Sequence, residues 1–213
     1  ERPLIGYESL PQPRITDVKL EVDLYPGEPR AVTRGSYTIQ NRTGKPLDEV
    51  HVRWVQPLQM KKLEVEGAKL VQEHVDHDYR IYRFDRPLAP LEVRHVAFET
   101  LREQKGFRNS NNEHRIVDNG TFLDNREIAP LLGMSRTGLL QDRAKRRKHG
   151  LPPELRPAKL EDESARAFNM LRNDGDWVTA DITVSTSARF SSCSATAIWA
   201  RAWASRASRG RAS

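Results

Sequence analysis

Two histidines, His74 and His77, come nearest to a reactive site in residue type and spacing. Glu73 precedes them, and Asp76 and Asp78 lie beside them. Imidazoles and carboxylates bind zinc, but a closed site needs three or four ligands that converge on one point. In an extended strand the two histidines would point to opposite faces, and no further ligand cluster supports them. We therefore favour a polar turn between strands over a metal site, and we assign no metal-binding residue.

Other catalytic patterns are missing from the sequence. The six histidines never form H-E-x-x-H, no G-x-S-x-G elbow frames a serine, and no glycine-rich loop ends in Gly-Lys-Ser/Thr. The single cysteine, Cys193, excludes an intrachain disulfide. Sequons at Asn41 and Asn119 matter only in a eukaryotic secretory pathway. We predict no catalytic and no cofactor-binding residue in this chain.

A run of cations occupies residues 143–149, where every residue except Ala144 is Arg, Lys or His. We interpret it as a solvated helix end, because cations there interact favourably with the helix dipole. An anionic membrane surface or a partner protein is the alternative. Nucleic acid is disfavoured, because no aromatic residues are interleaved for base stacking. The net charge of +6 supports this view, since five arginines in residues 188–213, which hold no acid, account for all but one unit.

Strands are the elements that must position these groups. In residues 15–24, Val18, Leu20 and Val22 alternate with charged residues, which predicts a strand with one buried face. Turns rich in proline and glycine separate it from similar segments. Strands are expected at residues 15–24, 32–40, 51–55, 62–65, 69–71, 79–84 and 93–100. This pattern predicts a mainly β fold, an antiparallel sandwich or a saddle-like sheet.

Aromatic residues in these strands have two interpretations. They form either a carbohydrate-binding platform or cross-strand packing in the core, and strand spacing favours the core. The five residues concerned are Trp54, Tyr79, Tyr82, Phe84 and Phe98.

The C-terminal half has a different pattern. The Asn-Gly pair at 119–120 predicts a turn between short strand pieces at 115–117 and 121–123. Two helices are expected: one capped by Ser135 or Thr137, running to about His149 and stopped by Gly150, and one over residues 160–171. A further strand is expected at 177–186.

These elements suggest three parts: an antiparallel β-domain at 1–101, its continuation with an irregular connector and two helices at 102–187, and a tail at 188–213. The tail is rich in Ala, Ser, Arg and Trp, so we expect it to be disordered. Out-of-frame translation of a GC-rich gene is our hypothesis for it, and a genuine basic tail is the alternative. Because the chain starts at Glu1 without a signal core, we expect a piece of a longer protein.

Several motifs carry a family resemblance. Pro-Arg-Ile-Thr-Asp-Val-Lys-Leu at 13–20, Arg-Ile-Tyr-Arg-Phe at 80–84 and Pro-Leu-Ala-Pro-Leu-Glu at 87–92 resemble the N-terminal β-domain of zinc aminopeptidases of the gluzincin, alanyl-aminopeptidase type. Further motifs resemble a narrower branch, in which bacterial proteins similar to ABC-type transporter permeases carry an aminopeptidase-like region. These are Asn-Gly-Thr-Phe at 119–122, Gly-Leu-Pro at 150–152 and Trp-Val-Thr-Ala-Asp at 177–181.

The resemblance implies a non-catalytic scaffold domain of a truncated protein, with residues 106–157 as the connector to a zinc peptidase domain. The family's H-E-x-x-H and Gly-x-Met-Glu-Asn motifs are absent here, so no catalytic residue is carried over, and zinc belongs to the missing domain. The implied partners are that peptidase domain and a permease region, in a parent protein at the bacterial inner membrane. A binding module on a membrane transporter, or part of an active aminopeptidase completed downstream, are the alternatives.

Two departures from the family pattern are expected to matter. The usual Pro-Gly-Glu turn has Leu91 in place of glycine. The strand at 177–186 runs directly into the anomalous tail, so we expect it to lose its onward partners and to leave an open sheet edge.

Overall fold

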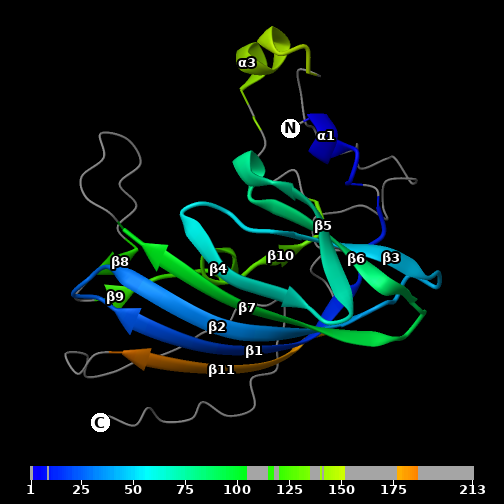
Figure 1. Cartoon of the computed structure of the whole chain (residues 1–213). Helices are drawn as coiled ribbons and strands as arrows, with labels where there is room; N and C mark the ends of the chain where they lie inside the picture. The colour runs from blue at the N-terminus through cyan, green and yellow to red at the C-terminus, as the bar shows by residue number, and fades with distance from the viewer. Residues whose placement is uncertain are drawn as a thin grey trace.

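The computed structural model describes residues 2–8, 10–104, 115–117, 120–134, 140, 142–151 and 177–186. Two β-sheets share one hydrophobic core (Figure 1). The first has the order β11 (Thr179–Thr186), β1 (Arg14–Tyr25), β2 (Arg30–Gln40), β7 (Val93–Glu103), β4 (Leu58–Val65). The second has the order β10 (Leu131–Leu132), β3 (Leu47–Arg53), β6 (Tyr79–Leu88), β5 (Ala68–His74). A separate hairpin pairs β8 (Ile116–Val117) with β9 (Gly120–Thr121).

The helices of the described residues are short. They are α1 (Arg2–Ile5), α2 (Asn125–Ile128), α3 (Arg143–Lys148) and the 3₁₀ turn η1 (Val75–His77). None of these described helices is long and apolar enough to cross a bilayer. The prediction of a mainly β fold is therefore confirmed.

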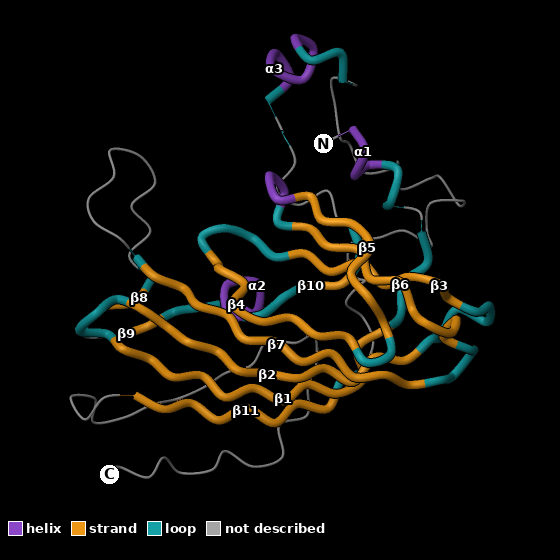
Figure 2. The backbone as a smooth tube through the Cα atoms, viewed as in Figure 1, coloured by secondary structure: helices purple, strands orange, loops and turns teal. Residues whose placement is uncertain are grey.

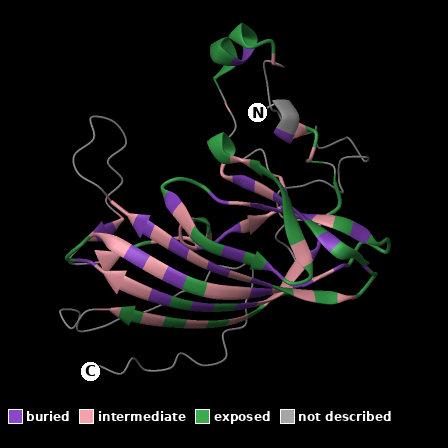
Figure 3. Ribbon diagram, in the orientation of Figure 1, coloured by how far each residue is buried: buried purple, intermediate pink, exposed green. Residues whose placement is uncertain are grey.

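The segments with alternating apolar and charged residues form strands, because each strand buries its apolar face in the core. Val18, Leu20 and Val22 of β1 lie in the core, while Lys19 and Glu21 between them are exposed. Figure 3 shows this alternation as changing colour along β1. The five aromatic residues named above are all buried, which confirms their interpretation as core.

Close packing across the first sheet depends on Gly35 of β2. A Cβ atom there would lie 2.6 Å from Leu20 Cδ2 and 2.6 Å from Phe98 Cζ. Glycine therefore leaves the space that these two core side chains fill.

One strand pair in the first sheet departs from the antiparallel pattern. The pairing of β11 with β1 is parallel, from Asp17 opposite Thr179 to Leu24 opposite Thr186, so this sheet is mixed rather than antiparallel. Alternation fixes which face of a strand is buried but not which way the strand runs. The inward side chains of this segment face the core whichever way the strand runs. They are partly buried and pack against the core, namely Val178, Ala180, Ile182 and Val184. This strand keeps β1 as a partner and is the last strand described on its side of the sheet.

The helix predictions were partly right. The helix expected from residue 135 or 137 begins only at Arg143, because the Asp142 side chain accepts a hydrogen bond from Lys145 N at 2.7 Å and caps it. Ser135 and Thr137 lie outside the described residues, as does the helix expected at 160–171. Gly150, with φ of +63°, ends α3 as expected. The four-residue α2 was not predicted.

The turn between β6 and β7 contains Leu91, the departure from the resembled motif noted above. Leu91 has φ of +65°, the left-handed region that favours glycine, and its side chain is 71% exposed.

Replacing Leu91 by Gly is expected to raise the free energy of unfolding by about 1 kcal/mol. A side chain in this conformation costs about 1–2 kcal/mol, part of which the greater chain entropy of glycine offsets. Urea unfolding measures the change. Val75→Gly is the matched control, because Val75 is 73% exposed without a positive φ, and it should destabilise instead. Lower stability of Leu91→Gly would contradict the strain argument.

Candidate functional site

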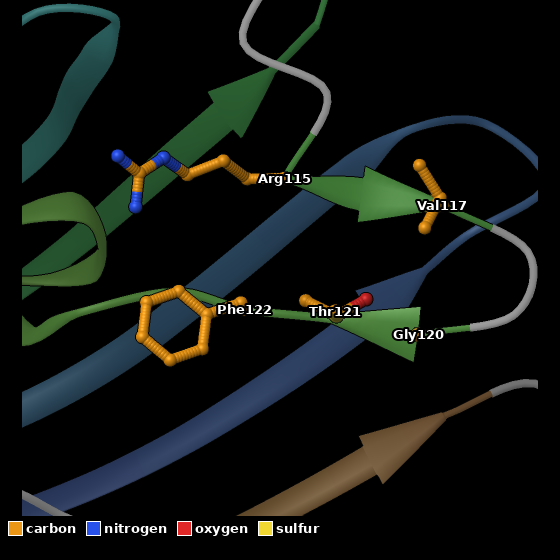
Figure 4. Close-up of a pocket in the computed structure, with 5 residues that line it drawn as sticks. All are labelled: Arg115, Val117, Gly120, Thr121 and Phe122. Atoms are coloured by element: carbon orange, nitrogen blue, oxygen red, sulfur yellow. The ribbon is translucent and has the colours of Figure 1, made fainter.

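The β8–β9 hairpin lies at one end of the sandwich and borders a surface hollow. Five of the described residues line it, as Figure 4 shows: Arg115, Val117, Gly120, Thr121 and Phe122. Phe122 is 71% exposed, a large apolar surface for a single side chain. The hairpin is thus the described part of the 106–157 stretch with the features of a contact site.

Hydrogen bonds hold the hairpin against the end of β7. The Gln104 side-chain oxygen accepts hydrogen bonds from Arg115 N at 3.0 Å and from Ile116 N at 2.7 Å. Phe122 N donates to Arg115 O at 3.0 Å, and Ile116 is 1% exposed. The backbone that carries Phe122 is therefore fixed to the sheet.

A buried ionic network fixes the segment that follows. Glu127 Oε1 lies 3.0 Å from Arg102 Nη2 and 3.2 Å from Arg115 Nε, and Arg102 is only 2% exposed. Asp124 N donates to Glu127 Oε2 at 2.9 Å, and the Asp124 side chain caps α2, which completes a capping box. Glu127 therefore joins β7, the hairpin and α2 through one carboxylate.

Two further hydrogen bonds seat α2 on the sheet, where Figure 2 shows it as a single helical turn. Thr100 Oγ1 donates to Ile128 O at 2.6 Å, and the Tyr37 hydroxyl donates to Pro130 O at 2.9 Å. Complete burial raises the pKa of Tyr37 far above its ordinary value, so this hydroxyl stays protonated and donates at every physiological pH.

The described lining of the hollow is suited to contact. It holds one guanidinium, one hydroxyl and apolar surface. Neither a histidine nor a carboxylate is among the five lining residues to act as a base on Thr121. A rigid hairpin with an exposed aromatic side chain instead suits docking.

The histidines singled out in the sequence lie on two different elements. His74 ends β5 and its ring lies 6.2 Å from the rings of Tyr7 and Tyr79, while His77 lies in η1. Within the described ranges no group of three His, Cys, Asp or Glu residues is placed to hold a metal ion. These residues do not fit zinc, and we derive no catalytic step through it.

The sequon at Asn41 is structural. Asn41 is fully buried, and its side chain donates to Lys45 O and to Leu88 O, each at 2.7 Å, while accepting from Thr43 N and Thr43 Oγ1. It is therefore inaccessible to a glycosyl donor in the folded chain. Asn119 lies outside the described residues.

The basic run forms α3, and one of its cations differs from the rest. Arg146 is 1% exposed and donates from Nη1 to Leu140 O at 2.7 Å. The other cations of the run are exposed, namely Arg143, Lys145, Arg147, Lys148 and His149. Nothing in the run itself distinguished Arg146, because its hydrogen bond to Leu140 O lies outside the run.

The comparisons with known proteins give a partial likeness. An M1 zinc metallopeptidase from Deinococcus radiodurans is 16% identical with a TM-score of 0.36, and the match covers 47% of this chain and 24% of that one. Yeast LTA4 hydrolase is 10% identical with a TM-score of 0.32, covering 44% and 15%.

This likeness is limited in extent. The chain spans no more than about a quarter of the length of these enzymes, and at such scores the match carries no argument about activity. No protein-family model matches the chain, and no curated protein matches its sequence.

A second polar cluster, which the sequence analysis did not predict, surrounds His51. This residue is 1% exposed, and its Nδ1 lies 2.8 Å from the Tyr79 hydroxyl. The Tyr7 ring meets the imidazole edge-on at 5.0 Å, and the His51 backbone N donates to the Gln12 side chain at 2.8 Å. The N-terminal segment thus covers the outer face of the second sheet through His51.

Burial lowers the pKa of His51 below its ordinary value, against the raising effect of Glu49, whose Oε2 lies 3.6 Å from Nε2. The unfolded chain therefore takes up a proton at His51 more readily than the folded chain does. The contribution of His51 to the free energy of unfolding is complete above the ordinary histidine pKa of about 6.5 and falls as the pH drops below that value.

Replacing His51 by Gln is expected to flatten that part of the pH dependence, because the amide stays neutral. Urea unfolding at intervals between about pH 7.5 and pH 5 measures the slope. His95→Gln is the control, since His95 lies on the exposed surface and should leave the slope intact. An unchanged slope in His51→Gln would show that another group titrates.

Proposed function

We propose that this chain is a non-catalytic scaffold domain of a longer protein related to the zinc metallopeptidases. In that protein it packs against a peptidase domain and forms one wall of the substrate cleft. The observation that carries the proposal is the clamped β8–β9 hairpin, which presents Phe122 to solvent beside a hollow whose described lining is one guanidinium, one hydroxyl and apolar surface. The motif resemblance in residues 13–92 and 119–181 supplies the identity of the partner.

Zinc enters this proposal only through that partner domain. The described residues of this chain do not converge on a metal site, so its own contribution is to dock and to shape the cleft. The finer link to a transporter permease, and a parent at the bacterial inner membrane, rests on the motifs at 119–122, 150–152 and 177–181 alone.

A peptidase assay tests the scaffold role directly. The purified chain is expected to leave aminoacyl chromogenic substrates intact with zinc present. Turnover that a chelator abolishes would overturn the proposal and favour an active aminopeptidase.

Reading the DNA that follows codon 187 in all three frames tests the partner. We expect an H-E-x-x-H peptidase domain there. The domain, expressed separately, should bind this chain, and Phe122→Ser should weaken that binding about tenfold or more, as for a hot-spot residue. Val75→Ser, at an equally exposed position far from the hairpin, is the matched control. If none of the three frames encodes an H-E-x-x-H domain, the proposal loses the partner domain on which it depends.

The second candidate is a binding module on a membrane transporter, which the exposed cations of α3 favour. Neutralising Lys145, Arg147 and Lys148 by Gln should then abolish co-sedimentation with liposomes that contain the transporter. Arg146 is left unchanged in this test because it is buried and structural.

A further inference from the structure

The Leu91 turn combines two features that do not stabilise the domain. A leucine occupies a left-handed backbone conformation, and its side chain is 71% exposed. Such backbone outliers persist where the surrounding structure enforces them, and they cluster at functional positions. The exposed leucine is therefore a candidate contact residue in its own right.

Hydrogen bonds hold this leucine in a fixed position. Leu91 N donates to Asn41 O at 2.8 Å, and the Gln40 side-chain nitrogen donates to Leu91 O at 3.1 Å. Asn41 N donates to Glu92 O at 3.1 Å, which ties the turn at 89–92 to the turn at 41–46. The two turns form one tip at the opposite end of β7 from the β8–β9 hairpin, toward the right of Figure 1.

The rim of this tip is cationic. Arg42, Lys45 and Arg86 are exposed around Leu91, and Glu92 is shared between the guanidiniums of Arg86 and Arg94. Arg42 and Lys45 make no ion pair in the described part of the chain. Exposed prolines complete the surface and add apolar area without side-chain freedom, at Pro46, Pro87 and Pro90.

We propose that this tip docks on an anionic lipid surface, with Leu91 entering the interfacial layer and the three rim cations meeting the headgroups. A convex apolar tip needs a complementary pocket in a protein partner, whereas lipid yields to its shape. A ring of cations around the tip matches a plane of anionic headgroups. The contact is small, so the binding is weak and reversible, and it orients the domain against the membrane. This proposal is independent of the peptidase partner.

Vesicle co-sedimentation tests the docking. Phosphatidylcholine vesicles are compared with vesicles that contain about 30% phosphatidylglycerol, at low and high salt. Arg42→Gln, Lys45→Gln and Arg86→Gln together should weaken anionic binding about 25-fold at low salt, because the two cations without an ion pair among the described residues, Arg42 and Lys45, each contribute about fivefold, while Glu92 already neutralises Arg86. Leu91→Gly should weaken it about tenfold. Since Leu91→Gly is also expected to stabilise the fold, its loss of binding cannot be ascribed to unfolding.

Matched variants remove the same charge elsewhere. Lys19→Gln, Lys61→Gln and Lys62→Gln together should leave the binding contributed by the tip unchanged, because these residues lie on strands away from it. Two outcomes would overturn the proposal. Binding to anionic vesicles that falls equally in both triple variants would indicate a non-specific charge effect. Binding that persists in Leu91→Gly would show that Leu91 does not enter the lipid and would leave a protein partner for the tip.

A separate measurement tests whether position 91 enters the lipid, and binding through the basic tail or α3 does not affect it. An environment-sensitive fluorophore is attached at Leu91→Cys in a Cys193→Ser background, since Cys193 is the only native cysteine. Its emission should shift to the blue on anionic vesicles, and should still shift when Lys145, Arg147 and Lys148 are replaced by Gln. The same label at Val75→Cys should not shift. No shift at position 91, or an equal shift at position 75, would contradict insertion.

Discussion

Replacing Glu127 by Gln is expected to lower the free energy of unfolding by about 3–5 kcal/mol, the usual cost of removing one partner of a buried ion pair. The guanidinium of Arg102 is 2% exposed, and Glu127 Oε1 neutralises it at 3.0 Å. Without that carboxylate a cation remains buried under α2. The capping box of α2 and the clamp on Arg115 weaken with it. Chemical denaturation of the two chains measures the difference.

Two comparisons isolate the buried charge in this prediction. Glu64→Gln removes an exposed pair with Lys62, whose side chains are 64% and 55% exposed, and should cost less than about 1 kcal/mol. Arg102→Met added to Glu127→Gln should recover part of the loss, because it removes the unpaired cation. If Glu127→Gln is as mild as Glu64→Gln, then water reaches Arg102 and the burial argument is wrong.

Replacing Asn41 by Ala is expected to cost about 3 kcal/mol, the second largest effect. The substitution leaves the carbonyl oxygens of Lys45 and Leu88 without the two donations at 2.7 Å, and an unsatisfied buried group costs about 1–3 kcal/mol. The 41–46 turn also loses the acceptor that Thr43 N and Thr43 Oγ1 share. Thermal unfolding followed by circular dichroism measures the loss.

Variants at and beside this position separate its hydrogen bonds. Thr43→Val removes only the hydroxyl bonds and should cost about 1 kcal/mol. Asn41→Asp keeps the acceptor but places a carboxylate against two carbonyl oxygens, so it should be at least as destabilising as Ala. A small effect of Asn41→Ala, together with a large effect of Thr43→Val, would show that the Thr43 hydroxyl and not the Asn41 amide stabilises this turn.

The strands were predictable because their signal is local. Val18, Leu20 and Val22 alternate within one segment, and so do Tyr37 and Ile39, so the buried face follows from the sequence. The direction of β11 was not predictable, since alternation is the same in either direction. For α2 a signal was present, because Asp124 and Glu127 have the spacing of a capping box, but four residues are too few to show a helical period.

The candidate site was less predictable because it depends on contacts distant in sequence. His51 begins an expected strand, yet its burial comes from Tyr7 and Gln12 in the N-terminal segment. Arg102 is buried only because Glu127 folds back over β7. Single charged residues carry no pattern that a local rule detects. The Leu91 turn is different, because the sequence analysis already singled out this leucine as a departure from the motif that the turn resembles.

The parallel pairing of β11 with β1 has a consequence for synthesis on the ribosome. Asp17 of β1 pairs with Thr179, so one edge of β1 has no strand partner until more than 150 further residues have been synthesised. At about 5–20 residues per second this interval lasts roughly 8–30 seconds. During that time β1, β2 and β7 can already pair, while the outer hydrogen-bonding groups of β1 stay open to other strands. The nascent chain therefore carries its greatest risk of mispairing at the edge that its last described strand finally covers.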